Sequence, residues 1–232
     1  MIHSVFVLIG AGLHDRKRSM ELPVVVKVCG LTRQEDVDFA LNLGADFLGF
    51  ILCPESPRGL SLKDATELLA HVPTEKRVAV DIEPTLDALK RYRDAGFHAF
   101  QVHERGSVDL SLLASWSELV GKDRLWFAPR LKSAGNFPKQ ALKYADTILI
   151  DSYTVSQVGG TGKTGDWQGF RDLQKEYAAH RFILAGGLNP DNIADALAIS
   201  SACHVDVNSG VESQPGVKDA LRLKAFFHAI GR

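Results

Sequence analysis

The 232-residue sequence has few cysteines, almost no net charge and no long apolar run, and each shortage excludes a class of protein. Three cysteines without a C-x-x-C pair indicate neither a disulfide framework nor a zinc ribbon, and they fit a reducing cytoplasm. A formal net charge of -1 argues against nucleic acid and anionic membrane as partners. The eight histidines are scattered, without metal-ligand spacing, and no redox-cofactor fingerprint occurs. We therefore expect a cytoplasmic protein with a small-molecule site, no metal and no cofactor.

The first 22 residues do not share the pattern of the rest of the chain. The apolar run Ser4–Leu13 is too short to span a bilayer, and basic residues follow it instead of preceding it as in a secretory signal. A second methionine, Met20, stands just before the first convincing strand. We expect residues 1–22 to be an N-terminal appendage, which an upstream start codon would explain, and residues 23–232 to form one catalytic domain.

Short apolar segments, often β-branched, alternate with segments of helical periodicity. The predicted strands are Val24–Cys29, Ala45–Leu52, Arg77–Ile82, His98–Val102, Arg124–Arg130, Thr147–Ile150, Arg181–Leu184 and His204–Val207. Between the first two strands, apolar residues recur at helical spacing. Thr32 and Glu35 predict a capping box there, and Asn189-Pro190 predicts the start of a later helix.

Eight such units without a break in composition predict an α/β protein with a single (β/α)8 TIM barrel. An open doubly wound sheet is the alternative that the alternation leaves open. In a barrel of this kind the active site lies at the C-terminal ends of the strands. Residues that end or follow a predicted strand are therefore the candidates for function.

Cys29 ends the first predicted strand, in VVVKVCGLT. It is either a buried apolar filler, as free cysteines often are, or a reactive thiol. Glycine and a predicted helix N-terminus follow it, and a helix N-terminus stabilises a thiolate, so we expect a lowered thiol pKa. Cys53 is followed by proline and Cys203 precedes a strand, which makes both weaker candidates.

Charged residues and a histidine end or follow other predicted strands. Asp151 comes directly after apolar residues in TILIDSY, where it is either a turn or cap residue or a general acid. Arg58, in PESPRGLS, is either solvated or a ligand for a carboxylate, which a guanidinium can bind with two parallel hydrogen bonds. His103 and Arg130 end the fourth and fifth strands, where each either contacts substrate or closes its strand.

Three glycine-rich stretches follow the last three strands, at Val158–Trp167, Ala185–Pro190 and Asn208–Glu212. Barrels often bind phosphate with the loops after strands 7 and 8, because glycine lets backbone amides approach an anion. The stretch GGTGKT lacks the glycine spacing of a P-loop, which argues against nucleotide hydrolysis. The residues alone thus predict a cofactor-free isomerase with a phosphorylated small-molecule substrate.

Seven stretches resemble, in order, the phosphoribosylanthranilate isomerase family of tryptophan biosynthesis. They are KVCGLT, GADFLGFILCPESPRGLS, FQVH, LID, GGTGKTGDW, LAGGLNPDN and DVNSGVE. The resemblance covers the chain from about Val24 to the C-terminus. It implies the Amadori rearrangement of N-(5-phosphoribosyl)anthranilate to 1-(2-carboxyphenylamino)-1-deoxyribulose 5-phosphate, without a cofactor.

The resemblance also implies roles for individual residues. Cys29 would be the general base that takes the C2 proton of the sugar, and Asp151 the general acid that protonates the ring oxygen as the furanose opens. Arg58 would hold the anthranilate carboxylate, and His103 would line the site. The implied phosphate ligands are the backbone amides of Gly186, Gly187, Ser209 and Gly210. The implied covering loop, Gly159–Gly162, contributes the substrate-binding residues Gly160 and Gly162.

Some positions depart from the family pattern. Gly165 stands where phenylalanine is usual, Glu104 where glycine commonly follows the site histidine, and Asn208 where serine is common. The third strand ends with Asp81 and Glu83 in place of an apolar-Val-Asn pattern. These differences leave room for an altered substrate preference.

Two alternatives remain. The first is a related phosphosugar isomerase or epimerase of altered specificity; such barrels tend to use paired aspartates at strands 1 and 5, and Cys29 at strand 1 argues against it. The second is a barrel that binds a phosphorylated metabolite without catalysis, against which the presence of both Cys29 and Asp151 argues. The oligomeric state stays open between monomer and homodimer.

Overall fold

The computed structural model describes residues 23–106, 108–131, 136–151 and 166–232. The expected appendage of residues 1–22 lies outside these residues. So do the predicted loop residues Gly160 and Gly162, together with the departure at Gly165.

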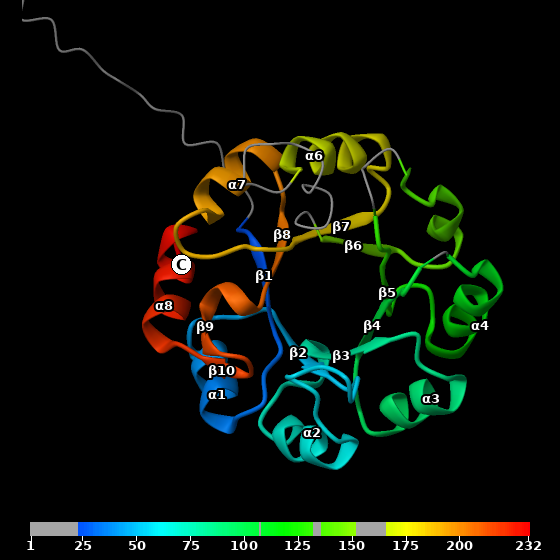
Figure 1. The fold of residues 1–232 in the computed structure, drawn as a ribbon, viewed down its shortest axis with the longest axis horizontal. Helices are drawn as coiled ribbons and strands as arrows, with labels where there is room; N and C mark the ends of the chain where they lie inside the picture. The colour runs from blue at the N-terminus through cyan, green and yellow to red at the C-terminus, as the bar shows by residue number, and fades with distance from the viewer. Residues whose placement is uncertain (1–22, 107, 132–135, 152–165) are drawn as a thin grey trace, which may run out of the picture.

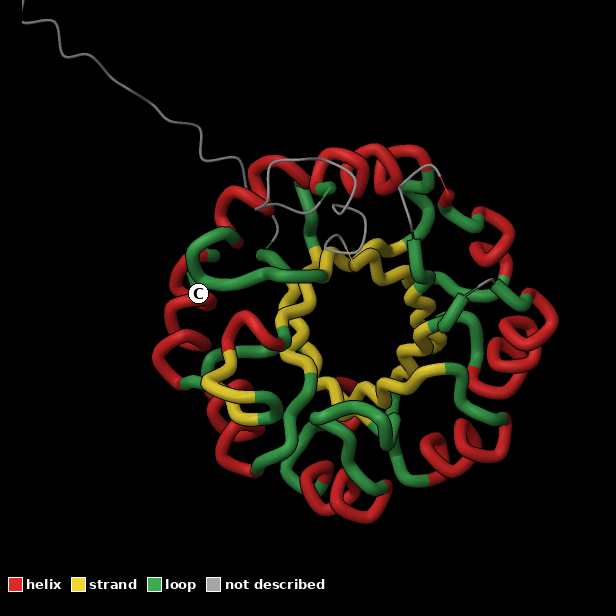
Figure 2. Tube along the Cα trace, viewed as in Figure 1, coloured by secondary structure: helices red, strands yellow, loops and turns green. Residues whose placement is uncertain are grey.

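Eight parallel strands close into a barrel with helices around its outside (Figures 1 and 2). The strands are β1 (Val25–Cys29), β2 (Phe47–Ile51), β3 (Arg77–Ile82), β4 (Ala99–His103), β5 (Leu125–Ala128), β6 (Thr147–Asp151), β7 (Arg181–Ala185) and β8 (His204–Val207). Each pairs with its sequence neighbours, and β8 pairs with β1. The predicted TIM barrel is confirmed and the open sheet is excluded, because closure leaves no edge strand.

Seven α-helices of the described residues surround the strands (Figure 2). They are α1 (Gln34–Asn42), α2 (Leu62–Leu69), α3 (Leu86–Asp94), α4 (Leu110–Val120), α6 (Trp167–Glu176), α7 (Ile193–Ser200) and α8 (Ala220–Ala229). After β5 the described residues form a short 3-10 helix, η3 (Lys139–Lys143), where the repeating pattern predicted a full helix. None of the helices in the described ranges is long and apolar enough to cross a bilayer.

The described residues also form short 3-10 helices and one two-stranded hairpin. The 3-10 helix η1 (Thr74–Lys76) precedes β3. After β8 come the 3-10 helix η5 (Ser209–Val211) and a two-stranded antiparallel hairpin of β9 (Glu212–Gln214) and β10 (Val217–Lys218). This hairpin matters for the site, because it brings residues after β8 to the loops that follow β1 and β2 (Figure 1).

Successive residues of each strand face opposite sides, so the barrel has two apolar regions. On β1, Val26 and Val28 are fully buried and pack in the larger cluster, which lies between strands and helices. Cys29 belongs to a smaller cluster within the barrel, with Trp126 among its largest members. Burial on both faces explains why the strands are mostly apolar and often β-branched.

Most helices begin where the sequence offers a side-chain cap. The side chains that accept a hydrogen bond from a backbone N–H of the first turn are those of Ser61, Thr85, Asp109, Asp166 and Asp219. Such caps satisfy backbone donors that have no partner within the helix.

The predicted capping box of Thr32 and Glu35 is wrong. The N-cap of α1 is Arg33, and its side chain accepts no bond from the helix. Thr32 Oγ1 instead donates a 2.5 Å hydrogen bond to the Gly216 carbonyl oxygen in the β9–β10 turn. The Thr32 hydroxyl therefore forms a tertiary hydrogen bond, which the local sequence pattern does not predict.

The helix start predicted at Asn189-Pro190 is also too early. Helix α7 begins at Ile193, and its N-cap is Asn192. Asn189 Oδ1 accepts from the backbone N–H of Asp191 at 2.9 Å. Asn189 therefore caps a turn ahead of the helix, as asparagine often does in loops.

Candidate active site

A cavity of about 440 Å³ opens at the C-terminal ends of the strands. That volume lies in the usual range for small-molecule sites. The predicted site residues that line it are Cys29, His103, Asp151, Gly186, Gly187, Ser209 and Gly210. Residues more than 180 positions apart in sequence thus meet in one place, because every strand ends at the same rim.

Cys29 ends β1 and is 3% exposed. Burial raises the pKa of its thiol, while the Lys27 ammonium opposes this rise and the Asp206 carboxylate adds to it. The net pKa lies above the ordinary value. The expected lowering of the thiol pKa is therefore wrong, since loss of water around the sulfur outweighs the cations that lower the pKa.

Asp151 ends β6, in the cavity wall, as the sequence predicted. Its register partner on β7 is Ala185, the residue before the first glycine loop. The carboxylate is partly exposed, and its charge acts on Asp206, whose pKa is raised chiefly by burial. The acid candidate and the thiol thus face the same space from different strands.

His103 ends β4, as predicted, with its ring beside Gln101. Gln101 Nε2 lies 2.8 Å from His103 Nε2, and because an amide nitrogen can only donate, that ring nitrogen accepts. Burial first, and the Lys27 charge second, lower the His103 pKa to about 4. The ring is neutral near pH 7 and can offer hydrogen bonds but not charge.

Gln101 is a cavity residue that our sequence reasoning missed. It is 2% exposed, and within the described ranges its Oε1 has no hydrogen-bond partner. A buried polar atom without a partner is costly, so a ligand in the cavity would be favoured there. The signal was present in FQVH, where Gln101 and His103 are two residues apart and share a strand face.

The two glycine loops after β7 and β8 require glycine for different reasons. Gly186 and Gly187 have φ values of 89° and 64°, in the left-handed region that favours glycine. A Cβ on Gly210 would overlap the carbonyl oxygen of Leu188. The two loops therefore pack backbone against backbone at one side of the cavity, as a phosphate site built from amides requires.

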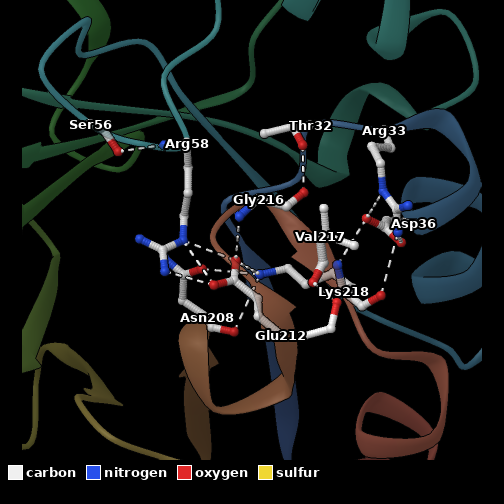
Figure 3. Close-up of polar contacts among 11 residues, drawn as sticks. Thr32, Arg33, Asp36, Ser56, Arg58, Asn208, Glu212, Gly216, Val217 and Lys218 are labelled. Atoms are coloured by element: carbon white, nitrogen blue, oxygen red, sulfur yellow. Dashed lines mark hydrogen bonds and ion pairs between the residues drawn. The ribbon is translucent and has the colours of Figure 1, made fainter.

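Arg58 lies beside the end of β1 rather than on the cavity wall, and its guanidinium is already paired (Figure 3). A Cβ on Gly30 would be 2.7 Å from Arg58 Cδ, which places the side chain next to the residue after Cys29. Arg58 Nε lies 2.9 and 3.1 Å from the two Glu212 carboxylate oxygens, and Nη2 donates at 2.6 Å.

Glu212 also binds Lys218, so its carboxylate joins two cations (Figure 3). Lys218 Nζ donates to Glu212 Oε1 at 2.9 Å and to Asn208 Oδ1 at 3.0 Å. Among the described residues, Arg58 Nη1 forms no hydrogen bond. The network therefore fixes one edge of the guanidinium and leaves the other for a ligand.

A buried ion pair, also missed from the sequence, lies inside the barrel. Lys27 Nζ is 2.9 Å from both carboxylate oxygens of Asp206, and the two residues are register partners on β1 and β8. Asp206 lines the cavity. The signal was a charged residue at an inward position of each of two largely apolar strands, VVKVC and HVDV.

Most described departures from the family pattern lie away from the cavity. Asp81 faces helix α3 and accepts a 2.7 Å hydrogen bond from the Tyr92 hydroxyl. Burial, and then this hydrogen bond, raise the Tyr92 pKa. Glu104 lines a different pocket, with Arg130. β5 ends at Ala128, so the prediction that Arg130 ends this strand is wrong. Of the departures that lie within the described residues, Asn208 alone lines the cavity.

The fold and this site define a (β/α)8-barrel protein with a thiol, a carboxylate and two glycine loops around one cavity. No group of three histidine, cysteine, aspartate or glutamate side chains in the part of the chain that the structure describes could hold a metal ion.

The chain belongs to the N-(5'-phosphoribosyl)anthranilate isomerase family. The family model described as N-(5'phosphoribosyl)anthranilate (PRA) isomerase matches residues 26–229. The N-(5'-phosphoribosyl)anthranilate isomerase of Aquifex aeolicus is 35% identical over 206 residues, which are 88% of this chain and 96% of that enzyme.

Solved structures of the family are similar as well. Phosphoribosyl anthranilate isomerase from Thermotoga maritima has a TM-score of 0.76 and 30% identity, over 90% of this chain and 98% of that one. A further solved structure is of monomers generated from the dimeric Thermotoga maritima enzyme. A phosphoribosyl anthranilate isomerase in complex with reduced 1-(o-carboxyphenylamino)-1-deoxyribulose 5-phosphate has a TM-score of 0.74 and 28% identity, over 90% and 98% of the two chains.

Proposed function

We propose that Cys29 and Asp151 exchange the protons of the isomerisation that family membership assigns to this chain. The reaction is the Amadori rearrangement of N-(5-phosphoribosyl)anthranilate to 1-(2-carboxyphenylamino)-1-deoxyribulose 5-phosphate, a step of tryptophan biosynthesis. The observation that carries the proposal is the convergence of the thiol, the carboxylate and the glycine loops on one cavity.

The proposed steps balance without a cofactor. Asp151 gives its proton to the ring oxygen, the bond from that oxygen to C1 breaks, and the nitrogen lone pair forms a C1=N double bond. The Cys29 thiolate then takes the proton from C2, and the released electron pair forms a C1=C2 double bond while the π pair of the C1=N bond returns to nitrogen. The enol at C2 becomes a ketone when its hydroxyl loses a proton and C1 gains one. General acid and general base thus act on two atoms of one small substrate.

The glycine loops are the proposed site for the substrate phosphate. The backbone amides involved are those of Gly186, Gly187, Ser209 and Gly210. Left-handed backbone at the first two and the close approach at the last allow amides to surround an anion without side chains in the way. Gly160 and Gly162 are proposed to cover the bound substrate.

Arg58 is the proposed ligand of the anthranilate carboxylate, and Gln101 and His103 are proposed to line the sugar. Glu212 holds the Nε edge of the Arg58 guanidinium, so the carboxylate would bind the other edge. The neutral His103 ring would contribute hydrogen bonds.

We further propose that the protein works in the cytoplasm, as a monomer or a homodimer, without nucleic acid or membrane as a partner. The near-zero net charge supports the absence of nucleic acid and membrane partners, since it gives no field for a polyanion or an anionic surface. Sedimentation of the purified chain would decide between the two oligomeric states.

Turnover of N-(5-phosphoribosyl)anthranilate by the purified chain tests the proposed roles. We expect Cys29→Ala and Asp151→Asn each to lower kcat by at least about a hundredfold, the usual range for general acid and base groups, with melting temperatures close to that of the wild type. An active Cys29→Ala variant would refute the assignment of the base. Cys203→Ala is the matched control, because Cys203 is exposed and outside the cavity, and it should keep full activity.

A further inference from the structure

The Lys27–Asp206 ion pair lies directly beside the Cys29 thiol. Lys27 and Cys29 are two residues apart on β1, so both side chains point into the barrel. A Cβ on Gly49, the register partner of Cys29, would be 2.9 Å from Cys29 Sγ and 3.0 Å from Lys27 Nζ. The sulfur and the ammonium thus meet at the space that a side chain would fill on β2.

We propose that Lys27 is a positioning residue of the reaction, whose ammonium stabilises the Cys29 thiolate in the buried site, while Asp206 holds that ammonium in place. The inference rests on the proposed role of Cys29 as the base. It extends that role to two residues that the sequence reasoning did not select.

The need for such a residue follows from the burial of Cys29. Removal of water disfavours a thiolate, and burial is the largest influence on the Cys29 pKa. Lys27 is the next largest, and it acts in the opposite direction. A general base must be deprotonated when substrate binds, so a nearby fixed cation makes the buried thiol usable.

Asp206 has the complementary task of keeping Lys27 charged. Burial alone would lower the Lys27 pKa, but the charge and hydrogen bonds of Asp206, together with the interactions with Cys29, outweigh burial and leave the pKa above its ordinary value. The Asp206 carboxylate also raises the Cys29 pKa, by less than Lys27 lowers it. The pair therefore favours the thiolate overall.

Other charges near the sulfur come from separate elements. Lys218 on β10 also lowers the Cys29 pKa, and Arg58, after β2, interacts with the same thiol. Both of these cations are already bound to Glu212. Lys27 is the cation on the strand of Cys29 itself, and it makes no bond to Glu212.

We expect the chain to fold without this ion pair when both charges are removed together. A buried ion pair can often be replaced by apolar residues of similar volume without loss of stability, because desolvation of the two charges is expensive. The apolar replacement Lys27→Met with Asp206→Leu therefore gives a variant that should fold without the charges. The single change Lys27→Met leaves Asp206 buried without its partner, which can unfold the chain.

The experiment follows the thiolate directly. The ultraviolet absorbance of the thiolate is measured as a function of pH. At each pH the absorbance of the corresponding Cys29→Ala protein is subtracted, so that the difference reports Cys29. It is measured for the wild type, for Lys27→Met and for the double variant Lys27→Met with Asp206→Leu. Lys122→Met is the matched control, since Lys122 forms an exposed ion pair with Asp146. Steady-state kcat and KM are measured over the same pH range.

We expect the Cys29 pKa to rise by at least about one unit in both Lys27 variants, so that kcat at neutral pH falls about tenfold and recovers as pH rises. The Lys122 variant should match the wild type. A folded Lys27 variant with an unchanged thiol titration would overturn the inference, even if Cys29→Ala is inactive. An active Cys29→Ala variant would instead show that the proposed function of Cys29 is wrong.

Discussion

Glu212, on β9, binds two cations beside the site: Lys218, on β10, and Arg58, in the loop after β2. Its carboxylate binds Arg58 through three short contacts and Lys218 through one. Burial alone would raise the Glu212 pKa, but these two partners outweigh it and the pKa lies below its ordinary value. The charge of Glu212 is therefore maintained at neutral pH to hold the edge of Arg58.

Removal of that charge should weaken substrate binding more than catalysis. In Glu212→Gln, the Arg58 guanidinium loses its charged partner and its fixed orientation. We predict that KM rises about tenfold, or roughly 1.4 kcal/mol, with a smaller change in kcat. Steady-state kinetics measures both constants. Glu67→Gln, in an exposed pair with Lys63, is the control and should behave as wild type; an unchanged KM in Glu212→Gln would contradict the positioning role.

Glu104 should make the stability of the protein depend on pH. Its side chain is 9% exposed, and its Oε2 has no hydrogen-bond partner within the described residues. Burial, and then the charge of Glu83, raise the Glu104 pKa to about 7. Between the ordinary value and about 7 the folded state binds more protons than the unfolded state, so stability falls as pH rises through this window.

The variant Glu104→Gln should remove this loss. We predict that it exceeds the wild type in free energy of unfolding by up to about 3 kcal/mol near pH 8, and by little near pH 4, where the wild-type carboxyl is protonated. Urea titrations at both pH values measure the difference. Equal pH dependence of the two proteins would show that Glu104 is not the group responsible.

At the level of elements, the site depends on how the loops after β7 and β8 meet. Gly210 lies in η5, and the carbonyl oxygen of Leu188 occupies the space that its side chain would need. The contact sets the distance between the two loops, and with it the spacing of the amides proposed to bind phosphate.

A single methyl group at this contact should separate the loops. For Gly210→Ala we predict a loss of about 1–3 kcal/mol in the free energy of unfolding, together with loss of the stabilisation that inorganic phosphate gives the wild type. Thermal melts with and without phosphate measure both effects. Gly106→Ala is the matched control, because nothing lies within 4 Å of a Cβ there. Retained phosphate stabilisation in Gly210→Ala would contradict the proposed phosphate site.

Helix starts show the limit of local reasoning at this scale. The Thr32 hydroxyl could have capped α1, as the sequence pattern predicted, but it bonds to the β9–β10 turn 184 residues away. At Ser61 and Asp219, whose side chains accept hydrogen bonds from the first turns of their own helices, side chain and helix start agree. A cap is thus predictable only when tertiary structure leaves its side chain free.

For the whole molecule, closure of the barrel depends on β1, which lies between β8 and β2. Its ladder begins at Val25, whose N–H donates to the Cys203 carbonyl oxygen at 2.8 Å. The C-terminal Arg232 also holds this strand, through the carbonyl oxygen of Val24 at 3.0 Å. Within the described part of the chain, the contacts that close the barrel start at Val24.

Deletion of residues 1–22 should accordingly leave the barrel intact. We predict that a chain beginning at Pro23 keeps the melting temperature and kcat of the full chain. Calorimetry and steady-state turnover of the two proteins, prepared in parallel, measure this. A large drop in either quantity would mean that these residues belong to the folded enzyme rather than to an appendage.

The sequence by itself determined the fold class and the positions of Cys29, His103 and Asp151 at strand ends, because strand periodicity and strand order are local patterns. The tertiary structure decided which charges meet. Lys27 and Asp206 are 179 residues apart and pair only because the register of β1 against β8 closes the barrel. Likewise, 154 residues separate Arg58 from Glu212. Desolvation and partner charges act through space, so the protonation of the thiol could be judged only once these distances existed.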